Sequence, residues 1–192
     1  DEMMFRFFQQ ELQALSRLDQ QGRLDLYFSD EASFHFNPQS MYGWQPPGQS
    51  YHLPSQRGNL LNILGFVKRD LTNTFYEYEQ AMNAEMFELL LEDFIQKHKK
   101  DKPLVIVLDR AAFHYNERIR TRMKEWRNRQ IYLQFLPAYS PELNIIEVVW
   151  KHCKHRWLSF KDWISPEQFK KKVRQILQNL GKEFHINFQI AF

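Results

Sequence analysis

Apolar residues recur at two spacings along the chain, and the change from one spacing to the other separates helices from strands. A repeat of three to four residues predicts helices over 3–18, 83–97, 116–127, 141–157 and 166–180. Alternating or continuous apolar runs predict strands over 24–28, 60–68, 74–79, 104–108, 131–136 and 184–192. Residues 37–58 are rich in Pro and Gly, and we expect loops and short strands there.

The order of these elements indicates the fold class. The strands at 60–68 and 74–79 are separated by five mostly polar residues and form a predicted hairpin. The continuous apolar run 104–108 is typical of a buried, parallel strand. Three strands followed by alternating helices and strands predict an α/β protein, with a mixed sheet that has an antiparallel hairpin portion and parallel strands, flanked by helices.

Composition excludes several classes of protein. A chain of 192 residues with 43% hydrophobic and 16% aromatic residues can build a core, which excludes disordered and fibrous proteins. No apolar run approaches the roughly 20 residues that span a bilayer, and the N-terminus lacks a secretory pattern. With Cys153 as the single cysteine, we expect a soluble, intracellular protein. Because residue 1 is Asp, the chain could be a piece of a longer protein.

The net charge of +3 hides two unlike halves. Residues 1–96 sum to −8, whereas residues 97–192 sum to +11. Such an asymmetry indicates a polyanionic partner for one face of the protein.

Acidic residues follow two of the predicted strands. Asp109 comes directly after the buried run 104–108, where open α/β sheets usually form their ligand crevice, although a lone strand-end Asp more often only begins a turn. Asp30 and Glu31 end the first predicted strand, with Asp30 in phase with Leu24, Leu26 and Phe28. Periodicity alone does not choose between the two acids.

A third acid lies on a predicted helix. Ser140 as a side-chain N-cap and Pro141 at the first helical position form a good helix start, which places Glu147 in the second turn. Glu147 could instead pair with Lys151, or complete a capping box with Asn144 if the helix begins later. Taken together, three carboxylates at strand ends and on a following helix suit a pair of Mg²⁺ ions, which promote phosphodiester displacement.

Three segments carry a resemblance to a known family. The segments 27–31 (YFSDE), 107–114 (VLDRAAFH) and 136–150 (LPAYSPELNIIEVVW) resemble the catalytic domain of mariner-like DDE transposases, and most of all the bacterial insertion-sequence branch called the six-thirty family. The resemblance extends over residues 24–157, and the third segment is its most specific part.

The resemblance implies a ribonuclease H-like fold that cuts DNA and transfers strands at transposon ends. It implies that Asp30, Asp109 and Glu147 are the catalytic residues and hold two Mg²⁺ or Mn²⁺ ions. The ligands would be supported by Glu31, His114 and Asn144. The chain departs from the branch at Arg110, where Asn is usual, and at Ile145, where Pro is usual.

Basic residues in the second half are the expected DNA contacts, because they follow the proposed metal ligands. They are Arg110, Arg118, Arg120, Arg122, Lys124, Lys151, Lys154, Arg156, Lys170, Lys171 and Lys172. We expect a homodimer on DNA, in the cytoplasm at the bacterial nucleoid. We also expect a separate or missing helix-turn-helix module for end recognition, because the first 23 residues cannot hold one.

The expected organisation is a lead-in helix over 1–23, the catalytic domain over 24–160 and a helix and strand extension over 161–192. Two alternatives remain open. One is an inactive transposase derivative that only binds DNA or assembles with partners. The other is a ribonuclease H-like nuclease that cuts without strand transfer.

Overall fold

A five-stranded mixed sheet forms the centre of the protein in a computed structural model. The structure describes residues 2–36, 47–48, 60–98, 101–111 and 117–188. The strands are β1 (Asp25–His35), β2 (Leu60–Val67), β3 (Asn73–Tyr78), β4 (Leu104–Leu108) and β5 (Ile131–Phe135), in the order β3-β2-β1-β4-β5. Strands β1, β2 and β3 pair antiparallel, while β1, β4 and β5 pair parallel. The predicted hairpin and the predicted mixed sheet are both confirmed.

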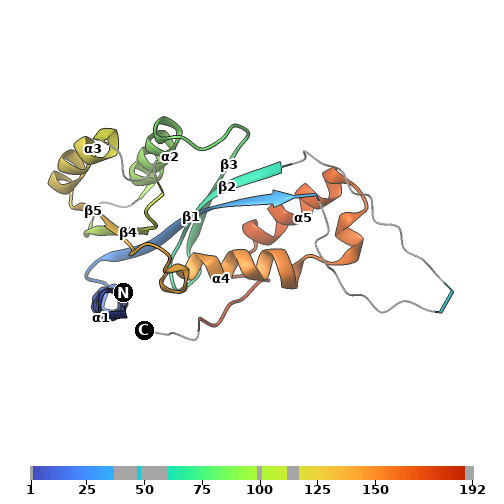
Figure 1. Cartoon of the computed structure of the whole chain (residues 1–192), viewed down its shortest axis with the longest axis horizontal. Helices are drawn as coiled ribbons and strands as arrows, with labels where there is room; N and C mark the ends of the chain where they lie inside the picture. Colours follow the sequence, from blue (N-terminus) through green and yellow to red (C-terminus); the bar gives the residue numbers. More distant parts are fainter. Residues whose placement is uncertain (1, 37–46, 49–59, 99–100, 112–116, 189–192) are drawn as a thin grey trace.

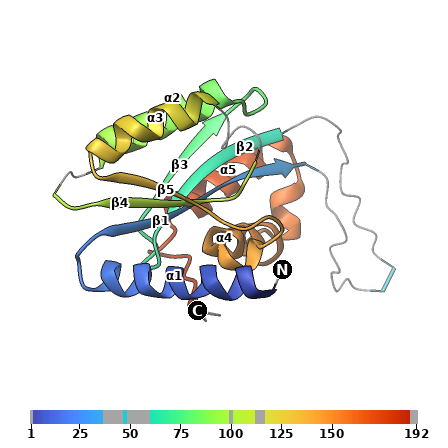
Figure 2. The same ribbon diagram turned by 60° about the vertical axis from the view of Figure 1, so that its left-hand side comes forward.

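Helices cover both faces of this sheet (Figures 1 and 2). They are α1 (Glu2–Gln20), α2 (Ala84–Lys97), α3 (Glu117–Asn128), α4 (Ile145–His152) and α5 (Pro166–Gln178). Figure 2 shows α2 and α3 on one face and α1 and α4 on the other. Side chains of β1 alternate between two buried clusters, with Leu26 and Phe28 facing α4 and Tyr27 facing α2. None of the described helices is long and apolar enough to cross a membrane.

The predicted helix over 141–157 is three consecutive segments. A short 3₁₀ turn (Pro141–Leu143) precedes α4, and a π-helical turn (Cys153–Trp157) follows it. The prediction of Ser140 as the side-chain cap was wrong, because its side chain makes no capping hydrogen bond. Asn144 caps α4 instead, accepting from the Ile146 backbone N–H at 3.4 Å. Glu147 therefore lies in the first turn of α4, not in the second turn of a longer helix.

Two strand predictions were also wrong in extent. Strand β1 continues to His35, so Asp30 lies within a strand rather than at its end, paired with Gly65 of β2. In the tail, residues 184–188 form no strand beyond a single bridge between Leu180 and Phe184, and 189–192 lie outside the described residues. The apolar alternation of the tail arises because its aromatic and aliphatic side chains pack against the buried cluster under α4.

A buried ion-pair cluster fixes the N-terminal end of β1. The Lys68 Nζ lies 2.6 Å from the Asp25 Oδ1 and 2.8 Å from the Asp19 Oδ1. Asp19 also accepts a hydrogen bond from the Leu26 backbone N–H at 3.0 Å. Asp19 belongs to α1, Asp25 to β1, and Lys68 directly follows β2. The cluster therefore ties the first helix to the sheet.

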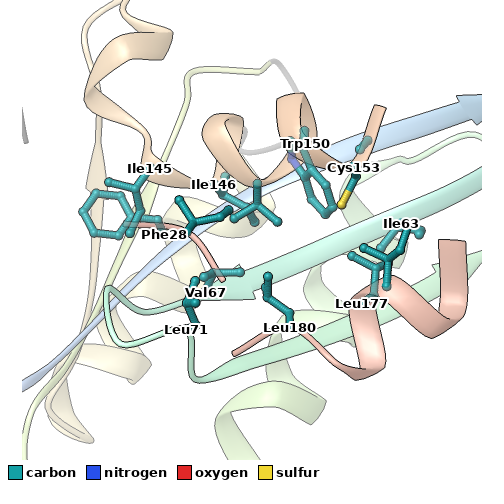
Figure 3. Close-up of a cluster of buried hydrophobic side chains, with 14 of the residues drawn as sticks. Phe28, Ile63, Val67, Leu71, Ile145, Ile146, Trp150, Cys153, Leu177 and Leu180 are labelled. Carbon is teal, nitrogen blue, oxygen red and sulfur yellow. The ribbon is translucent and has the colours of Figure 1, made fainter. Parts of the chain in front are cut away.

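Helix α4 approaches the sheet closely at Gly65. A Cβ atom added there would lie 2.7 Å from the Ile146 Cδ1 and 2.9 Å from both the Phe75 ring and the Trp150 Cζ2. Figure 3 shows Ile146 and Trp150 pointing from α4 toward the strands, beside Ile63 and Val67. The missing side chain at Gly65 therefore sets the height of α4 above β2.

We predict that Gly65→Ala destabilises the protein by about 1–3 kcal/mol, as overpacking a dense core usually does. Urea unfolding measures this loss. Adding Ile146→Val removes the nearest contact, so the double variant should recover part of the stability that Gly65→Ala loses. Full stability of Gly65→Ala alone would contradict the close packing.

Candidate active site

Three acidic side chains from three elements line one cavity of about 420 Å³. Asp30 comes from β1, Asp109 directly follows β4, and Glu147 lies in the first turn of α4. The segment Leu136–Pro141, which joins β5 to the 3₁₀ turn, lines the same cavity. The structure thus brings together all three acids that the sequence singled out.

The register of the parallel strands explains why two of the acids meet. Phe28 of β1 is aligned with Val107 of β4. Asp30 and Asp109 each lie two residues farther along, so they continue that alignment and share a face of the sheet. This is the face that α4 covers, because Phe28 belongs to the cluster packed under that helix.

Asn144 and Trp150 bond α4 to β1 on both sides of Glu147 in the sequence. The buried Asn144 Nδ2 donates to the Ser29 carbonyl oxygen at 3.1 Å. The Trp150 Nε1 donates to the Asp30 Oδ2 at 3.1 Å. Because Glu147 lies between these two anchors in the sequence, its backbone is held beside β1.

The protonated form of Asp30 is favoured in this site. Burial raises its pKa, and the negative charges of Glu31, Glu147 and Asp109 raise it further, to about 8. Burial and the charge of Asp109 also raise the pKa of Glu147, against the opposing effect of Lys154. The carboxylates thus carry an unfavourable concentration of negative charge.

The donor set of the cavity fits a hard divalent cation. Carboxylate oxygens are the ligands that Mg²⁺ and Mn²⁺ prefer, and a cation would offset the repulsion that raises the pKa of Asp30. In the part of the chain that the structure describes, no group of three His, Cys, Asp or Glu side chains is already arranged to hold a metal ion.

The other residues predicted at the site fall into different places. Asn144 and Arg110 line the cavity, although Asn144 is buried and Arg110 is exposed. Glu31 lies on the opposite face of β1 from Asp30 and does not line the cavity. His114 lies outside the described residues.

Basic side chains on α3, and Arg129 directly after it, face acidic side chains of α2. Arg118 and Arg122 pair with Glu88, the latter at 3.0 Å, and Arg129 pairs with Glu92 at 2.7 Å. Figure 1 shows the two helices side by side. Much of the positive charge of α3 therefore serves to hold it to α2.

The other predicted DNA contacts on α3 are Arg120, which lies 3.4 Å from Glu117, and the exposed Lys124. A second group lies after Glu147, with Lys151 on α4 and Lys154 and Arg156 on the π-helical turn. Three further lysines, Lys170, Lys171 and Lys172, lie on α5.

The sequence placed Trp150 only within the family-like segment 136–150, on a predicted helix, and gave Gly65 no role. The one signal for Trp150 was its spacing of three residues from Glu147, which places both on adjacent turns. Nothing in the sequence pointed to Gly65, because its role depends on a helix that lies 80 residues later.

Comparisons with known proteins place the chain among related folds. A family model described as DDE superfamily endonuclease matches residues 25–170. A curated relative, the "Insertion element IS630 uncharacterized 39 kDa protein" of Shigella sonnei, is 22% identical over 157 residues, which is 81% of this chain and 45% of the relative. The chain therefore spans less than half the length of that relative.

Solved structures share the fold at low sequence identity. The "Mos1 transposase paired-end complex with left transposon end" is 18% identical with a TM-score of 0.54, covering 92% of this chain and 59% of that one. The "Mos1 mariner paired end complex with Mn" is 16% identical with a TM-score of 0.54, covering 93% and 60%.

We predict that Asp30→Asn stabilises the metal-free protein at high pH. The carboxyl group has a pKa of about 8 in the folded state and an ordinary value near 3.8 when unfolded, so the folded state holds the proton more tightly. Its contribution to the free energy of unfolding therefore falls as pH rises from about 4 to 8. Removing the charge should raise the melting temperature at pH 8 by about 3 °C or more and have little effect at pH 4.

A carboxylate with the opposite shift provides the control. The ion pair with Lys97 and the hydrogen bond from Tyr76 lower the pKa of Asp93, so Asp93→Asn should not stabilise the protein at pH 8. Equal melting temperatures of wild type and Asp30→Asn across this pH range would show that Asp30 carries no charge penalty.

Proposed function

Because the chain belongs to the DDE superfamily endonucleases, we propose that it is the catalytic part of a transposase, which cleaves DNA strands at transposon ends and transfers them to target DNA. The observation that carries this proposal is the convergence of Asp30, Asp109 and Glu147 on one cavity, from two neighbouring parallel strands and the helix packed against them. The structural neighbours include a transposase complex with a transposon end, which supports the choice of DNA as substrate.

In this proposal, Asp30, Asp109 and Glu147 hold two divalent metal ions, Mg²⁺ or Mn²⁺. When bound, such ions supply positive charge at the attacking and leaving oxygens of a phosphodiester. Binding would shift Asp30 to its charged form, since a nearby cation favours the carboxylate. The indole N–H of Trp150 donates to the Asp30 Oδ2 and holds that oxygen in place.

Neighbouring side chains would position the DNA. Arg110 is exposed beside Asp109 and lines the cavity, where a guanidinium can contact a phosphate. Lys151 and Lys154 follow Glu147 by four and seven residues, which places them on the same side of the helical segment. These cations lie close enough to the acids for Lys154 to affect the pKa of Glu147.

The proposed assembly is a homodimer in which each copy acts on one transposon end. The paired-end complexes among the structural neighbours support it. End recognition would come from a helix-turn-helix module, either on a separate chain or on residues outside this one. The chain covers less than half of the Shigella sonnei relative, which leaves room for such a module in a longer protein.

We predict that Asp109→Asn abolishes Mg²⁺-dependent nicking of DNA that carries the native element ends, because the amide cannot supply a charged ligand. DNA affinity and melting temperature should stay within about twofold and a few degrees of wild type. A gel assay with Mg²⁺ or Mn²⁺ measures nicking, and anisotropy measures binding.

Asp101→Asn is the matched control. Asp101 is an exposed acid near the opposite end of β4, so nicking should be unchanged. Nicking by Asp109→Asn would refute the proposed ligands. Absence of nicking by the wild type would favour a derivative that only binds DNA, and nicking without strand transfer would favour a simple nuclease.

We also predict that the two basic groups differ in their effect on DNA binding. Replacing Lys151, Lys154 and Arg156 by Gln should weaken binding and reduce the dependence of log Kd on log salt by about 2–3, since each lost phosphate contact removes nearly one unit. Replacing Arg118, Arg122 and Arg129 by Gln should mainly lower the melting temperature, because it leaves Glu88 and Glu92 without their pairs.

Both triple variants remove three positive charges, so a general electrostatic effect would weaken DNA binding equally in the two. An equal loss of affinity and of salt dependence would therefore contradict the predicted difference between the two basic groups.

A further inference from the structure

Among the residues that the structure describes, Tyr139 is the most exposed large hydrophobic side chain, and it also lines the cavity of the acids. Its residue surface is 101% exposed. No packing gain explains why an aromatic ring is held in solvent, because burying such a ring is favourable. We therefore expect a ligand that covers the Tyr139 ring when the ligand binds.

The backbone at Tyr139 is also held in an uncommon conformation. Its φ angle is 57°, in the left-handed region that glycine and asparagine normally occupy. Strain of this kind persists only where the flanking structure imposes it, and it gathers at functional sites.

Two buried anchors impose this conformation on the loop. Before Tyr139, the buried Leu136 donates its backbone N–H to the Leu108 carbonyl oxygen at 2.8 Å, which extends the β4–β5 pairing to the edge of the cavity. After it, Leu143 is fully buried in the cluster under α4. Pro137 and Pro141 restrict the backbone between the anchors, so the ring is presented from a stiff segment.

We propose that Tyr139 stacks on an unpaired nucleobase of the DNA at the cleavage site. An exposed aromatic ring beside a carboxylate cavity matches the chemistry of nucleic acid whose bases are unstacked, since every base offers a flat face to such a ring. Arg110 on the same cavity can hold a phosphate while the ring holds the base. Stacking would keep the DNA open next to the phosphate that reacts, and this inference rests on the proposed function.

The test compares two short fluorescein-labelled duplexes of the same sequence, one fully paired and one with two unpaired adenines in the middle. Anisotropy with Ca²⁺ in place of Mg²⁺ gives the affinity for each. We expect the wild type to prefer the duplex with unpaired bases by about fivefold or more, the lower bound for stacking one base on an aromatic ring. Tyr139→Ala should lose the preference and keep its affinity for paired DNA, whereas Tyr139→Phe should retain both.

Tyr132→Ala is the matched control. Tyr132 is another exposed tyrosine, 43% exposed on β5, and does not line the cavity, so its loss should leave the preference unchanged. A second readout uses 2-aminopurine in place of one unpaired adenine. Its fluorescence should be quenched by the wild type and by Tyr139→Phe but not by Tyr139→Ala.

The inference is overturned if the wild type shows no preference, if Tyr139→Ala keeps it, or if Tyr139→Phe loses it. Failure of the inference is separable from failure of the proposed function. If the wild type nicks element ends with Mg²⁺ but shows no preference, only the stacking role of Tyr139 is refuted. If the wild type binds neither duplex, both the stacking role and the proposed function are refuted.

Discussion

The close approach of α4 to the sheet at Gly65 is the constraint on which the active-site geometry depends. No side chain separates the helix from β2 at this point, so the Trp150 ring packs against the strand while its N–H reaches Asp30 on the neighbouring strand. Glu147 lies one turn earlier on the same helix. The position of the third carboxylate is therefore set by the packing of Ile146 and Trp150 on Gly65, residues that supply no ligand.

The rest of the fold offsets the electrostatic cost of this site. Like charges raise the pKa of Asp30 and disfavour its ionised form, so the site destabilises the metal-free protein at neutral and high pH. Two buried clusters, one on each face of the sheet, and the ion pairs of Lys68 with Asp19 and Asp25 stabilise the scaffold elsewhere. A scaffold that is stable without the site can hold the acids in an arrangement whose repulsion is relieved by protonation of Asp30 and would be relieved by a bound cation.

Features that depend on local pattern could be predicted from the sequence, and features that depend on distant pairing could not. The apolar run ending at Leu108 was sufficient to place Asp109 after a buried strand, whereas the alternation before Asp30 left the choice between Asp30 and Glu31 to the family resemblance. The length of β1 was underestimated because pairing with β2 extends it beyond Asp30. The helix start at Ser140 was wrong, while the alternative of a later start capped by Asn144 was left open from the sequence. The bond from Asn144 to β1 depends on distant pairing and could not be predicted.

The charge asymmetry of the sequence is a further feature whose meaning depends on distant pairing. The acidic first half supplies Glu88 and Glu92, which pair with arginines of the basic second half, so part of the +11 is neutralised between α2 and α3. Whether a basic side chain can contact phosphate depends on which charged side chains lie next to it in the fold. Lys151 and Arg156 are exposed on a helical segment that begins at the active site, and this position, not the total charge, makes them the better candidates for phosphate contacts.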